Sequence, residues 1–410
     1  MNQPHGQVSI IIPTRARPDT LVHALRTAVE QRWENVDIIV SDNGGDEATR
    51  QVVDSFGDAR VRYVTTAGRV SMSDNFEFAS SHAKGDWLAV IGDDDGVLPT
   101  GLERALEALS QTRLEALGSR SAHYRWPFPQ GSGPEVYLTI PASRGFEVRD
   151  AKRAMADLLN NKGFFTEYPM LYTGGIISRG LFETIKAKRG RFFHSQIPDI
   201  YSGFAVCSMV DQYVFLREPA MVVGHSHHSH GANVDGKQAE QFRREASIPF
   251  HRDLAVEEGD PLTFILPALF YECFLQTAYL RGEKLAVDPA LQLRNALAAA
   301  ELVTPQSSEF RTFLSRWSRR FSEHHHLGSD TKVEYSVTER IGARVQAWRK
   351  RKRDLVNAYR VDESLGLGGA DVFQAAIITE KVMNERPSLA ANIAHSIKRV
   401  LLKTSPSPAA

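Results

Sequence analysis

The stretch WLAVIGDDD, from Trp87 to Asp95, places three consecutive carboxylates directly behind a short apolar run. Such a run is typical of a strand buried on both faces, as in a parallel sheet. Ligands of open α/β sheets bind outside the carboxyl ends of the strands, and adjacent carboxylates repel one another unless they are neutralised. Hard divalent cations prefer carboxylate oxygens. The stretch therefore predicts a Mg²⁺ or Mn²⁺ site that bridges the protein to a diphosphate; the alternative is an acidic, solvated turn.

Outward from this stretch, strands and helices alternate over the first 110 residues. Apolar, β-branched runs predict strands at Val8–Ile12, Val36–Val40 and Val61–Val64. Helical spacing predicts a helix that begins at Asp19, as the N-cap, and further helices over 48–56, 74–82 and 100–109. This alternation implies right-handed crossovers and a mostly parallel sheet.

The remainder of the chain divides into two parts. Up to about residue 230 the pattern is less regular, with strands expected at 171–177 and 221–224 and helices at 152–160 and 200–209. After about residue 235 helical periodicity dominates, over 262–281, 287–303, 308–321, 332–360, 370–384 and 388–403. We therefore predict an α/β domain over 1–234, a helical region over 235–404 and a disordered tail over 405–410.

Composition excludes some function classes. Among 410 residues there are 49 Lys plus Arg and 49 Asp plus Glu, so the chain as a whole is unlike a strongly basic nucleic-acid binder. Two cysteines suit a reducing compartment, and the polar N-terminus lacks the pattern of a signal peptide. The apolar run 262–280 contains interrupting polar residues and predicts a buried helix rather than a membrane span. These features predict a cytoplasmic protein.

The order of five segments carries a resemblance to a known family. VSIIIPTR starts at Val8, VDIIVSDNG starts at Val36, residues 68–75 follow, AKGDW starts at Ala83 and GDDDGVLP starts at Gly92. In this order they resemble the nucleotide-diphospho-sugar transferases of the family 2 glycosyltransferase type, densely over residues 8–110 and more thinly to about 230. The resemblance implies the GT-A fold, an α/β fold with a Rossmann-like, mostly parallel sheet flanked by helices, here with an appended α-helical C-terminal region.

The resemblance also implies which residues bind the donor. Pro13 and Thr14, with Arg15 next to them, match the strand-end segment that holds the nucleoside. Asp42 matches the acid that hydrogen-bonds the uracil or other base. Asn43 follows it and can hydrogen-bond a base or a ribose, and Asn75 matches an asparagine of the segment before the metal strand.

The acidic triplet matches the family's DxD signature in one of two registers. Counted back from Pro99, the family's first Asp falls on Gly92 and its metal-binding Asp falls on Asp94. A strict DxD pattern uses Asp93 and Asp95 instead. We place Asp94 and Asp95 nearest the ion and assign Asp93 to donor binding.

Inverting transfer needs a carboxylate to take the proton from the acceptor hydroxyl. In the resembling family this is an acid at the start of a later helix. Asp199 fits, with a plain N-cap as its alternative role, and Asp211 and Glu167 are the reserve candidates. Gly174 and Gly175 are expected to border the acceptor and the donor sugar, because adjacent glycines allow close backbone approach; a bulge or tight turn is the alternative.

A histidine cluster lies between His225 and His230. In an extended chain His225 and His227 share a face. One imidazole, taken as His225, would complete the metal shell, as a C-terminal His does in some GT-A enzymes, or donate to the diphosphate. A separate zinc site is less favoured because no Cys accompanies the cluster, and a polar loop is the alternative.

Two stretches in the C-terminal region suggest partners. Residues 340–360 hold eight basic residues and one acid, with apolar residues at helical spacing, which predicts contact with the anionic inner face of a membrane. Binding of an anionic acceptor and a solvated helix face are the alternatives. The apolar run 262–280 predicts a homodimer through the helical region, unless the run is buried within one chain.

Together these inferences predict a metal-dependent inverting glycosyltransferase. It would move a sugar from a nucleotide-diphosphate sugar, UDP-linked, to a hydroxyl of a glycan, lipid-linked or other acceptor, with Mn²⁺ or Mg²⁺ as cofactor and without nucleic-acid partners. One alternative is a sugar-1-phosphate nucleotidyltransferase, which normally needs a glycine-rich loop that residues 13–18 lack. The other is a non-catalytic binding module that keeps the fold.

Overall fold

The computed structural model describes residues 6–128, 136–172, 174–229, 244–257, 260, 262, 265–281, 285–300, 308–327, 358–361 and 371–385. Its strands are β1 Val8–Thr14, β2 Val36–Asp42, β3 Val61–Thr65, β4 Trp87–Val90, β5 Gly96–Val97, β6 Ala116–Arg125, β7 Tyr137–Pro141, β8 Phe146–Asp150, β9 Ile176–Ser178, β10 Gln212–His225 and β11 Ala358–Val361. Its α-helices are α1 Pro18–Val29, α2 Glu47–Ser55, α3 Met72–Ser81, α4 Gly101–Thr112, α5 Ala151–Leu159, α6 Arg179–Ala187, α7 Pro198–Cys207, α9 Leu266–Gln276, α10 Pro289–Ala300, α11 Ser308–His324 and α13 Val372–Glu385. Short 3₁₀ helices are η2 Phe165–Glu167, η4 Arg252–Leu254 and η6 Ala278–Leu280.

The described strands form one sheet in the order β11-β7-β6-β9-β4-β1-β2-β3, and β10 pairs with β5, β6 and β8. Strands β4, β1, β2 and β3 run parallel. Alternate side chains of β1 point to opposite faces of the sheet. Ile10 and Ile12 pack with the helices α1 and α4, whereas Ile11 packs with α3 and α7. Because both faces are covered, β1 and β2 are buried at every position, as the predicted apolar runs require.

The start of α1 differs from the sequence prediction. The N-cap is Arg17, Pro18 is the first helical residue, and Asp19 lies in the first turn. Asp19 as N-cap was therefore wrong, because proline fixes φ in the helical range and is favoured at the first position of a helix. Asp19 still favours the helix as an acid near its N-terminus.

The second half of the sheet is mixed. Strand β9 pairs antiparallel with β4 and β6, and β10 pairs parallel with β6 and antiparallel with β8. The strand predicted over 171–177 begins only at Ile176, and the strand predicted over 221–224 is the end of the longer β10. These changes bring a turn at 171–172 and the end of β10 to the same edge of the sheet as β1 and β4.

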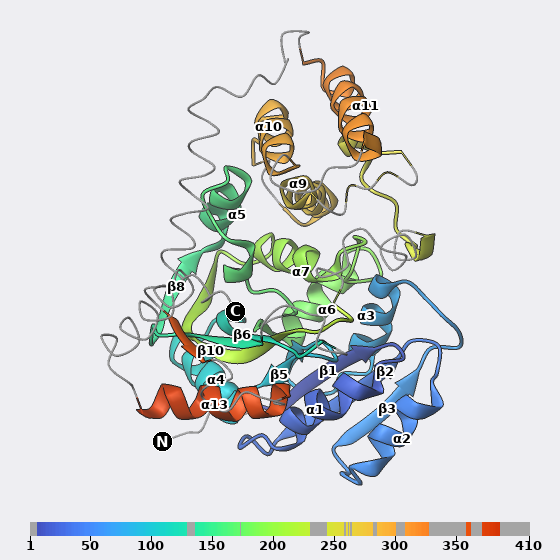
Figure 1. Ribbon diagram of the computed structural model, residues 1–410. Helices are drawn as coiled ribbons and strands as arrows, with labels where there is room; N and C mark the ends of the chain where they lie inside the picture. The colour runs from blue at the N-terminus through green and yellow to red at the C-terminus, as the bar shows by residue number, and fades with distance from the viewer. Residues whose placement is uncertain are drawn as a thin grey trace, which may run out of the picture.

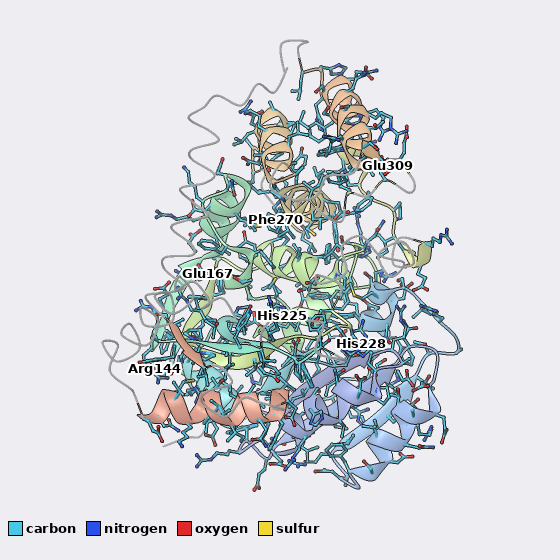
Figure 2. The ribbon with its side chains drawn as sticks, in the orientation of Figure 1. Arg144, Glu167, His225, His228, Phe270 and Glu309 are labelled. Atoms are coloured by element: carbon cyan, nitrogen blue, oxygen red, sulfur yellow. The ribbon has the colours of Figure 1, made fainter. Side chains whose placement is uncertain are left out.

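Helix α9, the longest described part of the apolar run 262–280, is largely covered within the same chain. Residues 268–274 of α9 are buried, and the helix packs on α5, α7 and α10 in a layer above α7 (Figure 1). Phe270 lies where this layer meets the one below it, with its ring 5.5 Å from that of Phe165 in η2 (Figure 2). The run therefore does not itself require a partner subunit, and the homodimer stays a prediction. Within the described ranges, we find no helix with the length and apolar character of a membrane span.

Later segments return to the sheet. Strand β11 pairs antiparallel with β7, and α13 packs on α1, β5 and β10. The helix predicted over 332–360 was wrong for 358–360, because Ala358–Val361 pair with the β7 edge as a strand. The rest of that range, including Arg349–Arg353, the helix predicted over 388–403 and the tail 405–410 lie outside the described residues. The predicted division at residue 234 stays a prediction, although β11 and α13 belong to the sheet region.

Candidate active site

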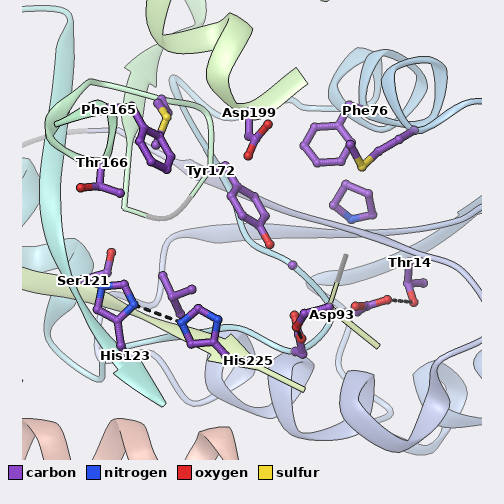
Figure 3. A pocket seen from close by; sticks show the side chains of 18 of the residues that line it. Thr14, Phe76, Asp93, Ser121, His123, Phe165, Thr166, Tyr172, Asp199 and His225 are labelled. Carbon is purple, nitrogen blue, oxygen red and sulfur yellow. Dashed lines mark hydrogen bonds between the residues drawn. The ribbon is translucent and has the colours of Figure 1, made fainter. Parts of the chain in front are cut away.

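A cavity of about 780 Å³ lies at the carboxyl ends of β1 and β4. Its lining also includes β6, η2, the first turn of α7 and the end of β10, and Figure 3 shows side chains from these segments converging. Nine of the predicted site residues line it, namely Pro13, Thr14, Arg15, Asn43, Asn75, Asp93, Asp94, Asp199 and His225. The cavity thus gathers both donor-side and base candidates.

Asp93 is neutralised by the protein. Thr14 Oγ1 donates to its Oδ2 at 2.7 Å, and Arg17 Nη1 donates to its Oδ1 at 3.1 Å. Arg17 Nη2 also donates to the carbonyl of His228 at 2.9 Å. Burial raises the pKa of Asp93, and Arg17 opposes that rise. Asp93 therefore ties the end of β1 and the start of α1 to the carboxylate turn.

Asp94 keeps one oxygen for a ligand. Its Oδ2 accepts hydrogen bonds from Ser226 Oγ at 2.6 Å and Ser229 Oγ at 2.7 Å. No hydrogen bond from the described residues reaches its Oδ1, and Asp94 lines the cavity. A buried carboxylate that is oriented by two hydroxyls and has one open oxygen fits a hard divalent cation.

Asp95 is bound by backbone groups. Its Oδ2 accepts from the amide of Gly92, and its Oδ1 accepts from the amide of Gly224, each at 2.8 Å. The side chain is 2% exposed, and burial together with the charge of Asp94 raises its pKa to about 7. The geometry gives Asp95 a structural role that joins the turn to β10.

His225, the last residue of β10, lines the cavity close to Asp94. Its Nε2 lies 3.3 Å from Nδ1 of His123, and the two rings stack with 8° between their planes. Burial lowers the pKa of His225, which favours the neutral imidazole that binds metals. Asp94 and His225 together form a donor set that fits Mn²⁺ or Mg²⁺.

His227 and His228 face α1 instead. Nε2 of His228 lies 3.1 Å from Oδ2 of Asp19, and the ligand atoms of the three residues lie within 4.8 Å of one another. Arg17 and the positive end of α1 lie beside them and disfavour a second cation. The contact therefore docks the histidine loop on α1. His230 lies outside the described residues.

Asp199 is the second residue of α7. The N-cap is Ile197, so the plain N-cap role expected as an alternative was wrong. Its Oδ1 is buried and has no hydrogen-bond partner in the described part of the chain. Burial raises the pKa of Asp199, opposed by backbone hydrogen bonds at the start of the helix. Figure 3 shows the carboxylate above Tyr172 in the cavity.

The two reserve acids are placed differently. Glu167 lines the cavity, but Arg149 Nη1 lies 2.7 Å from its Oε2 and Arg120 Nη2 lies 3.6 Å from its Oε1. Asp211 is exposed and is not among the described residues that line the cavity. Of the two candidate bases that line the cavity, Asp199 is thus the less neutralised by the protein.

Arg15 lies at the cavity edge in a charge network. Its Nη1 is 2.7 Å from Oε2 of Glu245, and Nε of Arg69 is 2.7 Å from Oε1 of the same carboxylate. Burial lowers the pKa of Arg15. Glu245 therefore brings a segment that follows β10 over the ends of β1 and the loop before α3.

Asp42 is fully buried at the end of β2. Its Oδ2 accepts from the amide of Asp46 at 2.6 Å and from the hydroxyl of Tyr63 at 2.8 Å. Its Oδ1 is buried without a partner among the described residues. Asp42 is not part of the described cavity lining, but its neighbour Asn43 is. An unpaired acceptor one residue from the cavity fits the base-binding role that the resemblance implies.

The two asparagines brace loops. The Asn43 side chain exchanges two hydrogen bonds with the backbone of Val70, at 2.9 and 2.8 Å. Asn75 Oδ1 accepts from Ser41 Oγ at 2.8 Å. Their amide groups therefore hold the strand ends in place beside the cavity.

Gly174 and Gly175 are constrained by packing. A Cβ on Gly174, whose φ is +110°, would lie 2.4 Å from Ser119 Oγ, and a Cβ on Gly175 would lie 1.5 Å from the carbonyl oxygen of Met170. Neither glycine is among the described residues that line the cavity. The tight-turn alternative accounts for both.

Several residues that shape the site were missed from the sequence. Ser226 and Ser229 lie within the histidine cluster, where their hydroxyls could have suggested partners for the acidic triplet. Arg17 follows the matched strand-end segment, but no spacing pairs it with Asp93. Glu245 and Tyr172 carry no local signal.

The chain is similar in sequence to two curated proteins. The succinoglycan biosynthesis protein ExoO of Rhizobium meliloti is 29% identical over 115 residues, covering 28% of this chain and 32% of that protein. The glycosyltransferase GlyG of Streptococcus pneumoniae is 20% identical over 195 residues, covering 46% of this chain and 62% of that protein. The chain therefore spans less than two thirds of the length of either curated relative.

Two solved structures are also similar. S. aureus TarS 1-349 in complex with UDP-GlcNAc is 12% identical, with 92% of each chain covered and a TM-score of 0.45. The mannosyltransferase PcManGT from Pyrobaculum calidifontis, in complex with GDP-Man and Mn²⁺, is 16% identical, with 87% of this chain and 89% of that chain covered and a TM-score of 0.40.

The family match falls on the region that builds the site. Residues 9–168 match the family described as glycosyl transferase family 2, and this range contains the ends of β1 and β2 and the Asp93–Asp95 turn. The mixed sheet flanked by helices is the fold that the resemblance implied. Residues 9–168 thus match glycosyl transferase family 2, and the mixed sheet has the architecture expected of a GT-A fold.

Proposed function

We propose that the protein is a metal-dependent inverting glycosyltransferase. It transfers a sugar from a nucleotide-diphosphate sugar to a hydroxyl of a glycan, lipid-linked or other acceptor. The observation that carries the proposal is the buried, unpartnered Oδ1 of Asp199, in the same cavity as the carboxylate turn. An unpartnered buried acid costs folding free energy, and such acids cluster at reactive sites.

The donor is UDP-linked in this proposal. Pro13 and Thr14 line the nucleotide side of the cavity, and the unpaired Oδ1 of Asp42 would accept a hydrogen bond from the base. Arg15 and Arg17 carry positive charge near the diphosphate position. Asn43 and Asn75 hold the end of β2 and the loop before α3 in place beside the nucleotide.

The cofactor is a divalent cation, Mn²⁺ or Mg²⁺. Asp94 Oδ1 and the neutral ring of His225 would hold it, with Ser226 and Ser229 orienting the carboxylate. When bound, the cation supplies charge that offsets the charge of the departing diphosphate. Asp93 and Asp95 fix the turn on which Asp94 stands.

Asp199 is the base in this proposal. Its carboxylate takes the proton from the acceptor hydroxyl as that oxygen attacks the anomeric carbon. Burial raises its pKa, which makes the carboxylate a stronger proton acceptor. Tight positioning in the cavity and electrostatic stabilisation supply much of the remaining acceleration.

A panel of nucleotide sugars tests the proposal by thermal unfolding, with and without Mn²⁺. We expect UDP-sugars to raise the unfolding temperature, more strongly with Mn²⁺, and one of them to raise it most. Release of UDP in the presence of candidate acceptors is then measured with that donor. If no nucleotide sugar stabilises the protein, the proposal is wrong. Stabilisation without transfer or donor hydrolysis would instead favour a non-catalytic binding module.

The homodimer and the peripheral membrane contact are further proposals. The membrane contact rests on the basic composition of 340–360 and the homodimer on the precedent of closed pairs, because α9 is already covered within the chain. Light scattering at micromolar concentration tests the dimer, and a monomer contradicts it. Flotation with anionic vesicles tests the membrane contact. A variant with the five basic residues 349–353 changed to Gln should float less.

A further inference from the structure

Tyr172 lies in the centre of the cavity, although the sequence pointed to the glycines after it. Figure 3 shows its ring between Asp199 and the turn that carries Asp93, with the hydroxyl directed toward that turn. The ring centroid lies 6.4 Å from that of Phe76. The hydroxyl lies beside the carboxylate of Asp95, and burial together with that charge raises the pKa of Tyr172. Tyr172 therefore reaches the carboxylate turn from a segment that lies next to α7.

The carboxylate beside this hydroxyl is hydrogen-bonded to the two segments that carry the candidate cation ligands. Asp95 accepts from the amide of Gly92 at the end of β4 and from the amide of Gly224 in β10. Asp94 adjoins Asp95, and His225 adjoins Gly224. The Asp95 carboxylate thus fixes Tyr172 relative to the two backbone segments that carry the ligands.

On its other side, Tyr172 is joined to the base. The amide of Leu171 donates to Ser202 Oγ at 2.8 Å. Ser202 Oγ donates to the carbonyl of Asp199 at 2.6 Å, and both residues belong to α7. Because Leu171 and Tyr172 are consecutive, a continuous path leads from the carboxylate turn to the residue that carries the unpartnered oxygen.

The hydroxyl also explains why residue 92 is a glycine. A Cβ on Gly92 would lie 2.6 Å from the Tyr172 hydroxyl oxygen and 2.9 Å from Oδ2 of Asp95. The φ of Gly92 is not in the left-handed range, so its backbone alone would accept a side chain. The position must be small because the Tyr172 hydroxyl fills the space beside it.

We propose that Tyr172 is a positioning residue for sugar transfer. Its hydroxyl, packed with the Asp95 carboxylate in the space beside Gly92, sets the separation between Asp199 and the segments that carry Asp94 and His225. The inference rests on the proposed function for the roles of those residues. The base and the leaving group act on opposite sides of one carbon, and a misplacement of about 1 Å costs roughly 10²-fold in rate.

Tyr172→Phe tests this role because it removes the hydroxyl and keeps the ring beside Phe76. We expect kcat to fall by about tenfold or more while the donor KM changes by less than about twofold. The matched control is Tyr168→Phe, because the Tyr168 hydroxyl is buried without a hydrogen-bond partner among the described residues and its ring packs on Phe204. The control should keep the wild-type kcat. Equal kcat values for the two variants overturn the proposal, and so does a loss that appears only in the donor KM.

A double-mutant cycle tests the geometry without any assay of transfer. Gly92→Ala should lower the unfolding temperature of the wild type, because its Cβ meets the Tyr172 hydroxyl. In the Tyr172→Phe background the same change should lower it by about half as much or less, because the closest approach is gone and only those to Asp95 Oδ2 at 2.9 Å and Asp94 Oδ1 at 3.3 Å remain. Additive shifts overturn the inference. The cycle remains informative if the protein transfers no sugar, so failure of the inference and failure of the proposed function are distinguishable.

Discussion

The turn after β4 and the first turn of α7 both bring acids to one cavity, but their carboxylates differ in how many hydrogen-bond donors surround them. In the β4 turn, Asp93 is bound by Thr14 and Arg17, and Asp95 is bound by two backbone amides. At α7, Asp199 keeps a buried oxygen that no described residue contacts by a hydrogen bond. A carboxylate with several donors holds the fold together, whereas an unpartnered one is destabilising and available for chemistry. The number of donors therefore separates structural acids from reactive ones.

The largest expected effect comes from replacing Asp199, the acid whose Oδ1 has no partner among the described residues. Asp199→Asn should lower kcat by about 10²-fold or more and leave donor affinity nearly unchanged, because the base acts in the transition state. Steady-state kinetics and donor titration measure the two quantities. Asp211→Asn is the control, since Asp211 is exposed, and it should behave as wild type. A parallel loss of donor affinity would make Asp199 structural.

The second effect concerns the one open oxygen in the β4 turn. Asp94→Asn should weaken cation affinity by roughly 10- to 100-fold, because a neutral amide is a poorer ligand for a hard cation. Mn²⁺ titration followed by donor-dependent thermal shift measures this. Asp54→Asn, on an exposed face of α2, should leave the titration unchanged. Wild-type cation dependence in Asp94→Asn would contradict the assignment.

The third effect is on stability. Asp95→Asn keeps one acceptor and places an amide nitrogen where an oxygen received a backbone donor, so one buried N–H loses its partner. We expect a loss of about 1–3 kcal/mol in the free energy of unfolding. Denaturant titration measures it. Unchanged stability would mean that Asp95 does not brace the turn.

The smallest effect that we expect is a pH-dependent rise in the unfolding temperature when Asp199 is replaced by Asn. Burial raises the pKa of Asp199, so the fold favours its protonated form. This contribution is present at acidic pH and is lost as pH rises through the raised pKa. Activity should rise with pH over the same window, because the base must be ionised. Asp199→Asn should therefore unfold at a higher temperature than wild type at neutral pH, with a smaller difference at acidic pH.

Much of the fold could be predicted because parallel strands buried on both faces appear as unbroken apolar runs. Strands β1, β2 and β4 followed from those runs, and the strand-end rule then placed Asp93 and Asp94 at a ligand crevice, to which the family resemblance added Thr14. Strand β11 could not be predicted, because Ala358–Val361 becomes extended only by pairing with β7. Tyr172 and Ser226 were missed for the same reason: their partners lie far away in the sequence.

The glycines show the limit of local patterns most directly. Gly174 and Gly175 were expected to allow close approach of a ligand. In the structure, Ser119 and Met170 of the protein itself pack against them. A glycine in the sequence can indicate that a side chain would not fit at that position, but it does not indicate which group occupies the space. The same ambiguity applied to Gly92, where the hydroxyl of Tyr172 occupies the space.

The pairing of β11 with β7 has a consequence for protein synthesis. Ala358 pairs with Pro141, which lies 217 residues earlier. At about 5–20 residues per second, a ribosome needs roughly 10–40 s to make the intervening chain. Throughout that time the β7 edge of the nascent protein lacks the strand that later covers it, and an open sheet edge is a template for pairing with other chains. Slower translation or a higher density of ribosomes on the message should therefore increase aggregation of newly made protein, even though the finished fold is unchanged.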